Sequence, residues 1–260
     1  MIEISKKITT NVGRTNAKFG LIKENDRIMI GFSGGKDSLT LLHTLNRMQK
    51  KAPFKFDFKA VTITYGMGEQ IEFLSNHCKE HGIEHEIIDT QIFDLAGEKI
   101  RKNSSFCSFF SRMRRGYLYT TALEQGYNKI ALGHHLDDAM ESYFMNLFYN
   151  GTMRTMPPIY KANNGLEVIR PLIFCRERQL RAFADSNEIR VIGDEACPGL
   201  RFDVKMPHAR ATTKELLAKL EEQNPKIFVS MKAAFSNIQL PTFFYNNLKD
   251  INLNIKDENI

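Results

Sequence analysis

The sequence predicts an α/β fold: a doubly wound, mainly parallel sheet of five strands with a small helical appendage at the C-terminal end. Three observations predict it. Short β-branched and apolar runs alternate with segments of helical period, which is the pattern of a parallel sheet with right-handed crossovers. A glycine-rich turn joins the first expected strand to the first expected helix. After residue 188 only helical patterns continue.

The chain divides into four expected parts. Residues 1–24 carry a weak helical pattern and are expected to form a lead-in helix, and residues 25–188 are expected to form the α/β domain. Residues 189–245 are expected to form a C-terminal helical segment, and residues 246–260 a flexible, Asn-rich tail. With 260 residues, 42% of them hydrophobic and 25% charged, the chain is long enough for one sizeable core.

The expected strands are β-branched or apolar, and the expected helices carry apolar residues three and four positions apart. A first strand begins at Ile28, and the others cover residues 58–64, 85–89, 129–133 and 168–169. A first helix begins at Leu39, and the others cover residues 69–81, 111–125, 137–149, 177–187, 212–223 and 225–235. Residues 94–110 are expected to be an irregular basic loop, and Pro157-Pro158 marks a rigid loop.

The turn after the first strand reads Ser33-Gly34-Gly35-Lys36-Asp37-Ser38. A strand followed by glycines and a helix N-terminus binds phosphate, because backbone N–H groups converge there and the helix dipole favours negative charge. The two glycines let the backbone approach an anion without a Cβ, and Lys36 adds a positive charge. Asp37 or Ser38 is expected to cap the helix. An ordinary glycine-rich turn is the alternative.

This turn is not a Walker A loop, because its glycines are one residue too close together and an aspartate follows the lysine. It resembles the pyrophosphate loop (PP-loop) of enzymes that cleave ATP between the α- and β-phosphates. The resemblance implies that Ser33 to Ser38 bind ATP and that Lys36 neutralises charge developing at the α-phosphate. Thr62 and Thr64, at the end of the second expected strand, are candidates to contact adenine or ribose, although β-branched residues are also good strand residues.

A second loop leaves the fourth expected strand and reads Gly133-His134-His135-Leu136-Asp137-Asp138. Because ligands bind outside the carboxyl ends of the strands in a doubly wound sheet, both loops are expected to face one crevice. Gly133 and His134 are expected to contact the nucleotide there, and Asp137 and Asp138 to bind Mg²⁺ or act as a base. The alternative is that the two carboxylates cap the following helix and the histidines are packing residues.

Arginines and phenylalanines interleave around the start of the third expected helix, where Arg112, Arg114 and Arg115 follow Phe109 and Phe110. Arginines contact phosphates and aromatic rings stack on bases, so this segment is predicted to bind single-stranded RNA. The net charge of +6 and the pI of about 9.0 agree with a polyanionic partner without requiring one. The alternative is a solvated basic helix face.

Four cysteines in 260 residues, with no close pair, do not form a disulfide framework. Cys78 and Cys175 fall at packing positions, whereas Cys107 and Cys197 fall outside the expected helices and strands, where functional residues are more common. No apolar segment has the length of a membrane span or forms the core of a signal peptide. We therefore expect a cytoplasmic protein without a membrane partner.

Five further motifs follow the PP-loop in order. They are Cys107-x-x-x-Ser111-Arg112-x-Arg114-Arg115-Gly116, Gly133-His134-His135-x-Asp137-Asp138, Met156-Pro157-Pro158, Ile169-Arg170-Pro171-Leu172 and Cys175-Arg176-Glu177. Together the motifs resemble the tRNA-cytidine 2-sulfurtransferases (TtcA family) over residues 20–240. The resemblance implies a HUP-like (adenine nucleotide α-hydrolase-like) fold, ATP and Mg²⁺ as cofactors, and a tRNA anticodon loop as substrate. It also implies that a cytidine is adenylylated with release of pyrophosphate and that sulfur then displaces AMP.

The resemblance further implies a [4Fe-4S] cluster, because the family carries two C-x-x-C pairs that supply three cysteine ligands. In this chain Phe110 and Asp194 stand at one cysteine position of each pair, so Cys107 and Cys197 remain as ligand positions. Two thiolates cannot hold a cluster in the three-cysteine form. The alternative is that Cys107 and Cys197 act as a persulfide carrier and its resolving thiol, supplied by a sulfur donor such as a cysteine desulfurase.

Two other functions stay open at this point. The tRNA(Ile)-lysidine synthetases use the same loop to activate cytidine for attack by lysine, without cysteines. An ATP- or RNA-binding protein that has lost sulfur transfer is the second, although mere binding does not require Asp137 and Asp138 beside a PP-loop. The motif from Ser111 to Gly116 and the Met156-Pro157-Pro158 motif favour thiolation. The oligomeric state is left open, with a homodimer as one arrangement that this fold adopts.

Overall fold

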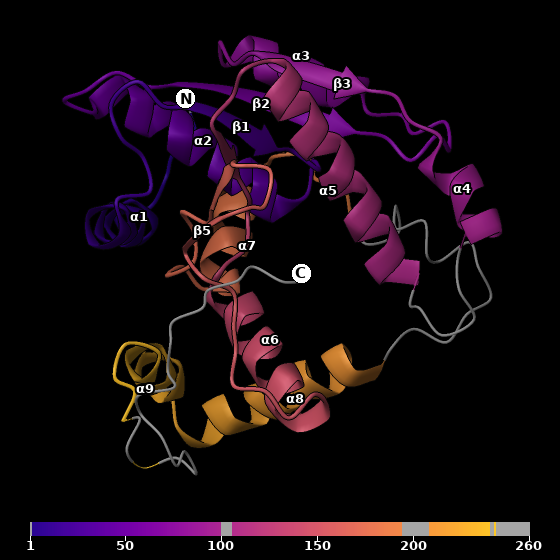
Figure 1. Cartoon of the computed structure of the whole chain (residues 1–260). Helices are drawn as coiled ribbons and strands as arrows, with labels where there is room; N and C mark the ends of the chain where they lie inside the picture. The colour runs from indigo at the N-terminus through magenta and orange to yellow at the C-terminus, as the bar shows by residue number, and fades with distance from the viewer. Residues whose placement is uncertain (1, 100–105, 194–207, 240–241, 243–260) are drawn as a thin grey trace.

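A mainly parallel sheet runs through the middle of the molecule in the computed structural model (Figure 1), which describes residues 2–99, 106–193, 208–239 and 242. Within these residues the strands are β1 Arg27–Gly31, β2 Asp57–Ile63, β3 His85–Ile88, β4 Lys129–Ala131, β5 Ile159–Lys161 and β6 Glu167–Ile169. Their order in the sheet is β3-β2-β1-β4-β6-β5. All neighbours are parallel except β5 and β6. The predicted doubly wound α/β class is confirmed.

The described part of the chain forms six strands, so the prediction of five was wrong by one edge strand. β5 pairs antiparallel with β6, with Tyr160 opposite Val168. The turn between them contains Gly165 at φ +92°, whose N–H donates to the Ala162 carbonyl over 2.9 Å. Strands of three residues are too short to show a period of two. The dipeptide Asn164-Gly165 is nevertheless a hairpin signal that could have identified them.

One layer of helices packs on one face of the sheet. It consists of α1 Lys6–Phe19, α2 Lys36–Lys51, α3 Glu72–Glu80 and α7 Glu177–Ser186. Because side chains alternate along a strand, Ile28 and Ile30 of β1 lie in this core, together with Leu42 of α2 and Phe183 of α7. α1 lies where the lead-in helix was expected, and Ile8 on α1 is fully buried in the same core.

The opposite face is covered by α4 Ile92–Lys99 and α5 Phe106–Glu124 (Figure 1). The expectation of an irregular loop over residues 94–110 was therefore wrong at both ends. Ile92 and Ala96 of α4 are fully buried against this face. α5 begins five residues earlier than expected, and Phe110 in its first turns is buried in the same core. Burial of these apolar side chains stabilises helix where the basic residues indicated a loop.

The remaining described helices, α6 Leu136–Tyr149, α8 His208–Gln223 and α9 Ile227–Ala234, lie together below the sheet in Figure 1. Leu136 and Met140 of α6, Leu217 of α8 and Phe228 of α9 form a small core of their own. α8 and α9 are the helices expected in the C-terminal segment. Among the described helices, none combines the length and the apolar content that crossing a bilayer requires.

Candidate active site

The two loops singled out in the sequence leave neighbouring parallel strands. β1 and β4 pair directly, with Ile28 opposite Lys129 and Ile30 opposite Ala131. β2 and β3 lie on the far side of β1, whereas β6 and β5 lie on the far side of β4. The chain therefore changes winding direction between β1 and β4, and open α/β sheets bind their ligands at this kind of point.

The PP-loop depends on Gly34 for its shape. Gly34 has φ +77°, and a Cβ at this position would lie 2.7 Å from the Ile192 Cδ1 atom and 3.0 Å from the Leu74 Cδ1 atom. The helix that follows has Gly35 as N-cap without a side-chain cap. The Ser38 hydroxyl instead donates to the Gly35 carbonyl and accepts from the Ser33 N–H. The expected cap by Asp37 or Ser38 is therefore absent, which leaves the first N–H groups of α2 for an anion.

Lys36 lies at this helix start between two carboxylates. Its Nζ is 3.4 Å from Asp37 Oδ2 and 3.2 Å from Glu177 Oε1. Lys214 Nζ also contacts Glu177, at 2.8 Å from Oε2. Burial alone would raise the pKa of Glu177, but the hydrogen bonds from Lys214 and Lys36 lower this pKa to about 2. Glu177 is therefore ionised at neutral pH and holds the Lys36 ammonium at the loop.

Asp37 has an unusual environment for a carboxylate. Its Oδ1 atom is buried without a hydrogen-bond partner among the described residues. His135 Nε2 lies 3.8 Å from this oxygen, whereas the Lys36 ammonium contacts the other oxygen, Oδ2. Burial raises the pKa of Asp37, and the charge of Asp138 acts in the same direction. A buried acceptor without a donor is costly, and a hard cation would satisfy it.

The second loop lies directly against the PP-loop because Gly133 has no side chain. A Cβ on Gly133 would lie 3.1 Å from the backbone carbon of Asp37 and 3.1 Å from the Ser38 nitrogen. Further along, His135 is the N-cap of α6: its Nδ1 accepts from the Asp138 N–H, and Asp138 Oδ2 accepts from the His135 N–H. The alternative that Asp138 helps to cap the following helix is therefore correct. Capping is compatible with a role of Asp138 at the site.

The two carboxylates of this loop have different partners. Asp138 Oδ1 accepts from Arg210 at 2.6 Å. Burial opposes ionisation of Asp138, but His135 and Arg210 stabilise the charged form, and the net effect lowers its pKa. The Asp137 carboxylate accepts from Arg176 at 3.0 Å and from the Glu177 N–H at 2.7 Å. Asp137 thus anchors the start of α7, whereas Asp138 stays near the PP-loop.

Arg176 connects this anchor to the C-terminal helices. Its guanidinium makes two 2.7 Å hydrogen bonds to Glu221 of α8 and lies 3.4 Å from the centre of the Phe228 ring of α9. A planar guanidinium can bridge two carboxylates and stack on a ring at the same time. The network therefore holds α7, α8 and α9 in place beside the site.

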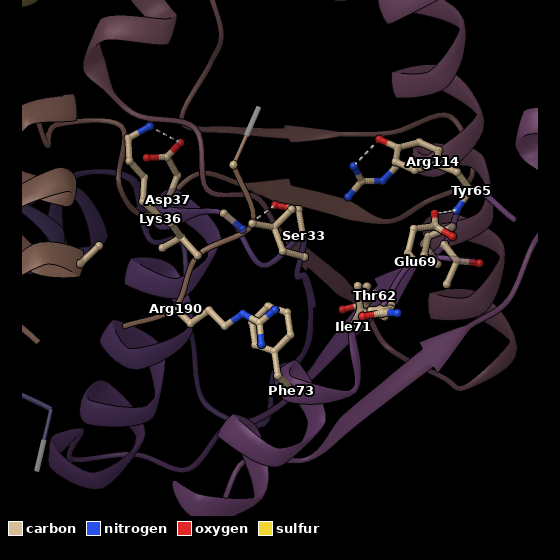
Figure 2. A pocket seen from close by; sticks show the side chains of 18 of the residues that line it. Ser33, Lys36, Asp37, Thr62, Tyr65, Glu69, Ile71, Phe73, Arg114 and Arg190 are labelled. Atoms are coloured by element: carbon tan, nitrogen blue, oxygen red, sulfur yellow. Dashed lines mark hydrogen bonds and ion pairs between the residues drawn. The ribbon is translucent and has the colours of Figure 1, made fainter. Parts of the chain in front are cut away.

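A cleft of about 790 Å³, called here the first cleft, opens beside the PP-loop (Figure 2). Its walls include Ser33, Gly35 and Lys36 of the loop, and Arg190, which stacks on Phe73 with 4.1 Å to the ring centre. This volume lies within the range of about 300–1,000 Å³ of ligand pockets. Glu69 also lines the cleft, and its carboxylate accepts from the backbone N–H groups of residues 65 and 67.

The two threonines predicted to contact the nucleotide line this cleft, but the protein already uses their hydroxyls. Thr62 Oγ1 donates to the Phe32 carbonyl over 2.7 Å, and Thr64 Oγ1 accepts from the Thr90 N–H over 3.0 Å. Both side chains are buried. Their hydroxyls thus stabilise the sheet edge, and contact with adenine or ribose stays a prediction.

A cleft of about 640 Å³, called here the second cleft, adjoins the first on the side of β4. Arg114 lines both clefts. Four further arginines line the second cleft, namely Arg115, Arg154, Arg170 and Arg210. Arg170 Nε donates to His134 Nδ1 over 3.2 Å, and burial followed by the charge of Arg170 lowers the pKa of His134 to about 4. His134 is therefore neutral at pH 7. The two clefts share Ser33, Asp37, Ile63, Tyr65 and Arg114.

The three arginines predicted to bind RNA take three different positions. Arg112 is exposed on α5, and Arg115 lines the second cleft. Arg114 lies at the wall between the clefts, where its Nη1 donates to the Tyr65 hydroxyl over 2.7 Å and its guanidinium lies 5.2 Å from the Tyr65 ring centre (Figure 2). The segment therefore faces both clefts and solvent. The RNA contacts stay a prediction.

Two of the four cysteines are buried as expected, whereas the expectation that Cys107 lies outside the helices was wrong, because this residue belongs to the first turn of α5. Cys78 and Cys175 are buried, and burial raises the pKa of each thiol to about 12, so both are packing residues. The Cys107 side chain, Cys197 and Asp194 lie outside the described residues. Phe110 is described, and its ring packs edge-on against Tyr65 and beside Phe93.

Some residues of the site had no assigned role in the sequence reasoning. Glu177 and Arg170 stood in the motifs of the resemblance, which was the only signal for them, since their partners lie far away in the chain. Nothing in the sequence pointed to Arg190 and Phe73 as site residues, because the contact between a loop arginine and a ring on α3 is formed only when the chain folds.

Comparison with known proteins identifies the family of the chain. Residues 4–205 match the family described as a PP-loop domain. The chain is 44% identical to the tRNA-cytidine(32) 2-sulfurtransferase of Geobacter metallireducens, over 90% of both chains, and 42% identical to that of Geobacter sulfurreducens, also over 90% of both. Among solved structures, the U34-tRNA thiolase NcsA from Methanococcus maripaludis with its [4Fe-4S] cluster shares the fold. The TM-score is 0.73 at 24% identity, over 89% of this chain and 78% of that one.

Proposed function

Because the chain belongs to the PP-loop family and, within it, to the tRNA-cytidine(32) 2-sulfurtransferases, we propose that it adenylylates a cytidine of tRNA with ATP and then replaces the activated oxygen with sulfur. The observation that carries the proposal is the meeting of two clefts at the PP-loop. An adenylylating enzyme must bring the α-phosphate of ATP against a second substrate. The shared wall, which includes Ser33, Asp37 and Arg114, provides one place where both substrates meet.

The proposed chemistry has two steps. First, the O2 atom of the cytosine attacks the α-phosphorus, so that a new P–O bond forms and the bond to the pyrophosphate group breaks. The free N–H groups of α2 and the Lys36 ammonium stabilise the charge that develops there. A sulfur nucleophile then attacks C2 of the base, and AMP leaves with the former carbonyl oxygen.

We propose Asp37 and Asp138 as the protein ligands of the Mg²⁺ that accompanies ATP. Mg²⁺ typically takes one or two carboxylates besides phosphate oxygens and water. Asp37 offers a buried oxygen without a donor, and its charge and that of Asp138 repel each other, which a cation between them would reverse. Asp137, the other predicted ligand, does not line either cleft in the described part of the chain. Its proposed role is to position α7, and through Glu177 the Lys36 side chain.

The second cleft is proposed to receive the tRNA. Sequence-specific RNA recognition targets bases that are splayed out of single-stranded loops, which fits the anticodon loop that contains nucleotide 32. Arg115, Arg154 and Arg170 supply positive charge for the backbone of such a loop, and Arg114 with Tyr65 offers a planar surface beside the PP-loop. Arg112 is proposed to contact phosphate outside the cleft.

The cluster implied by the resemblance does not fit the residues that can be tested. At one of the cysteine positions the buried Phe110 ring supplies no metal ligand. We therefore propose a route without a cluster, in which a donor such as a cysteine desulfurase loads a persulfide on Cys107 or Cys197. The outer sulfur bonds to C2 as AMP leaves. The second thiol then attacks the inner sulfur, which breaks the S–S bond, leaves the outer sulfur on C2 and forms a disulfide that an added thiol reductant returns to two thiols. Stoichiometric iron and acid-labile sulfide in anaerobically purified protein would contradict this route.

The decisive experiment follows the products of ATP in the presence of tRNA and Mg²⁺. The proposal predicts AMP and pyrophosphate in a tRNA-dependent reaction, and ADP as product would contradict it. Lys36→Ala is expected to slow both products by about 100-fold or more, because it removes a charge at the reacting phosphate. Lys214→Ala is the matched control, since Lys214 contacts the same Glu177 carboxylate from the exposed side.

Mass spectrometry of tRNA nucleosides from a deletion strain tests the second step. Loss of 2-thiocytidine, restored by the wild-type gene, is the expected result. Unchanged 2-thiocytidine, with no AMP formed by the purified protein, would instead support an ATP- or RNA-binding protein without catalysis.

A further inference from the structure

Three histidines gather between α2 and α3, outside the lining of both clefts. They are His43 on α2, His77 on α3, and His81 at the C-cap of α3, four residues after His77. His43 is buried, and the other two are half-buried at the surface. One ring nitrogen from each lies within 4.8 Å of the others, which makes this a potential metal-ligand set within the described residues.

The geometry of the rings suits a single ion. Two imidazole nitrogens on one tetrahedral ion lie about 3.3 Å apart when each metal–nitrogen bond is about 2.0–2.1 Å, and the ring centres then lie about 5 Å apart. Here His43 Nε2 and His77 Nε2 are 2.7 Å apart, and the three centre-to-centre distances are 4.9, 4.8 and 4.6 Å. Shifts of less than about 1 Å would therefore place all three nitrogens around an ion.

A backbone carbonyl orients one of the three rings for this purpose. His81 Nδ1 lies 2.9 Å from the His77 carbonyl, which has no proton, so Nδ1 carries the hydrogen and donates it. The lone pair of His81 is then on Nε2. Histidines that bind metals almost always donate their other ring nitrogen to a carbonyl, a carboxylate or water in this way.

Burial, helped by nearby positive groups, keeps the His43 and His77 rings neutral, which is the state that binds metal. Burial, followed by the neighbouring His77 and His81 and by Lys50, lowers the pKa of His43 to about 3. Burial and His81 also lower the pKa of His77, against a smaller opposing contribution from Glu80. Both rings are therefore neutral at pH 7. One hydrogen lies between the two Nε2 atoms, and metal binding requires this hydrogen to move to Nδ1 of its own ring, a change of tautomer that releases no net proton.

We propose that His43, His77 and His81 bind one divalent transition-metal ion of the Zn²⁺ type, with water at the fourth position. Imidazole nitrogens are preferred ligands of Zn²⁺ and of its neighbours Co²⁺, Ni²⁺ and Cu²⁺, whereas Mg²⁺ prefers oxygen. The site is separate from the proposed Mg²⁺ at the PP-loop. Bound metal would fasten the C-terminal end of α3 to α2, and α3 also carries Phe73 in the wall of the first cleft.

The test uses full-length protein without a histidine tag, stripped with a chelator and titrated with Zn²⁺ by calorimetry. Wild type is expected to bind one equivalent of Zn²⁺. His77→Gln and His81→Gln are each expected to weaken Zn²⁺ binding by at least roughly 10–100-fold, because removal of a mere outer-shell partner already costs that much. His85→Gln is the control, because His85 is a half-buried histidine that bonds to Thr62 and Ser75 instead. With Co²⁺, an absorption spectrum without a sulfur-to-metal band identifies nitrogen ligands and separates this site from the cysteines.

Thermal unfolding of each stripped variant shows whether it folds. Since His77 and His81 are tested separately, one unstable variant leaves the other informative. Equal Zn²⁺ affinity and stoichiometry in wild type, H77Q and H81Q would overturn the proposal, as would the absence of binding in wild type. A rise in the melting temperature of wild type, but not of H77Q or H81Q, on adding Zn²⁺ would support the fastening of α3 to α2.

Discussion

The two clefts that meet at the PP-loop are built in different ways. The first cleft takes its binding groups from the backbone: Gly34 shapes the turn, and the start of α2 beside the cleft has no side-chain cap. The second cleft takes its binding groups from charged side chains, of which Arg170 and Arg210 are examples, on elements far apart in the sequence. Both clefts are suited to phosphate groups, yet only the first is encoded by a contiguous motif.

This difference shows how one site can serve two phosphate-bearing substrates. A tight loop of backbone donors suits the compact phosphates of ATP, because it presents several N–H groups with little side-chain freedom to lose. A nucleic acid backbone is longer and needs several separate cations. Its binding surface must therefore be assembled by the tertiary fold, and the Asp137–Arg176–Glu221 network holds part of that assembly together.

The largest expected effect comes from distorting the backbone of the PP-loop in the first cleft. Gly34→Ala places a methyl group 2.7 Å from Ile192, in a left-handed conformation that itself costs about 1–2 kcal/mol. We expect pyrophosphate release to fall by about 100-fold or more, since a displacement of about 1 Å at the reacting group can cost that much. The assay is tRNA-dependent pyrophosphate release.

Gly82→Ala is the matched control for backbone strain. Gly82 also has a positive φ, +67°, but a Cβ there meets nothing within 4 Å. Its activity is expected to stay near that of wild type. If G34A and G82A lost activity equally, the close approach of the PP-loop to its neighbours would not matter.

The next effect concerns the charged network beside the second cleft. Arg176→Ala removes the guanidinium that bridges the half-buried Asp137 and Glu221 carboxylates, which then keep the Glu177 N–H and the exposed Arg178 as partners. Losing hydrogen bonds to charged groups is destabilising, and we expect a loss of roughly 2 kcal/mol in the free energy of unfolding by urea. Lys219→Ala, which breaks an exposed pair with Glu215, is expected to change little. Equal effects of the two variants would show that the network does not stabilise the fold.

The smallest expected effect is a change in the salt dependence of tRNA binding, which distinguishes the second cleft from the first. Arg115→Ala is expected to weaken tRNA binding and to reduce the slope of log Kd against log salt concentration by about 1, because one phosphate contact is lost. ATP binding should not change, since Arg115 lines only the second cleft among the described residues. Arg47→Ala, an exposed arginine on α2, is the control. A change in ATP affinity in R115A would mean that the two clefts do not bind separate substrates.

Much of the fold could be predicted because strands and helices leave local periods. The β1 and β2 strands, the second loop and the helices α6, α7, α8 and α9 lie close to their expected positions. The errors occurred where the period was too short or was hidden by charge. β5 has only three residues, and the apolar side chains of α4 and Phe110 were outweighed by the basic residues around them.

The sequence by itself determined the PP-loop, because six adjacent residues define its backbone path and glycine is the residue that this path requires. The tertiary structure alone decided which carboxylates are left at the site. Arg176 lies 39 residues from Asp137, and Arg210 lies 72 residues from Asp138, so no local pattern shows these pairs. The unpaired oxygen of Asp37 also appears only after folding has buried it. An ion pair depends on the distance between two charges in space, and that distance is set by the packing of whole elements.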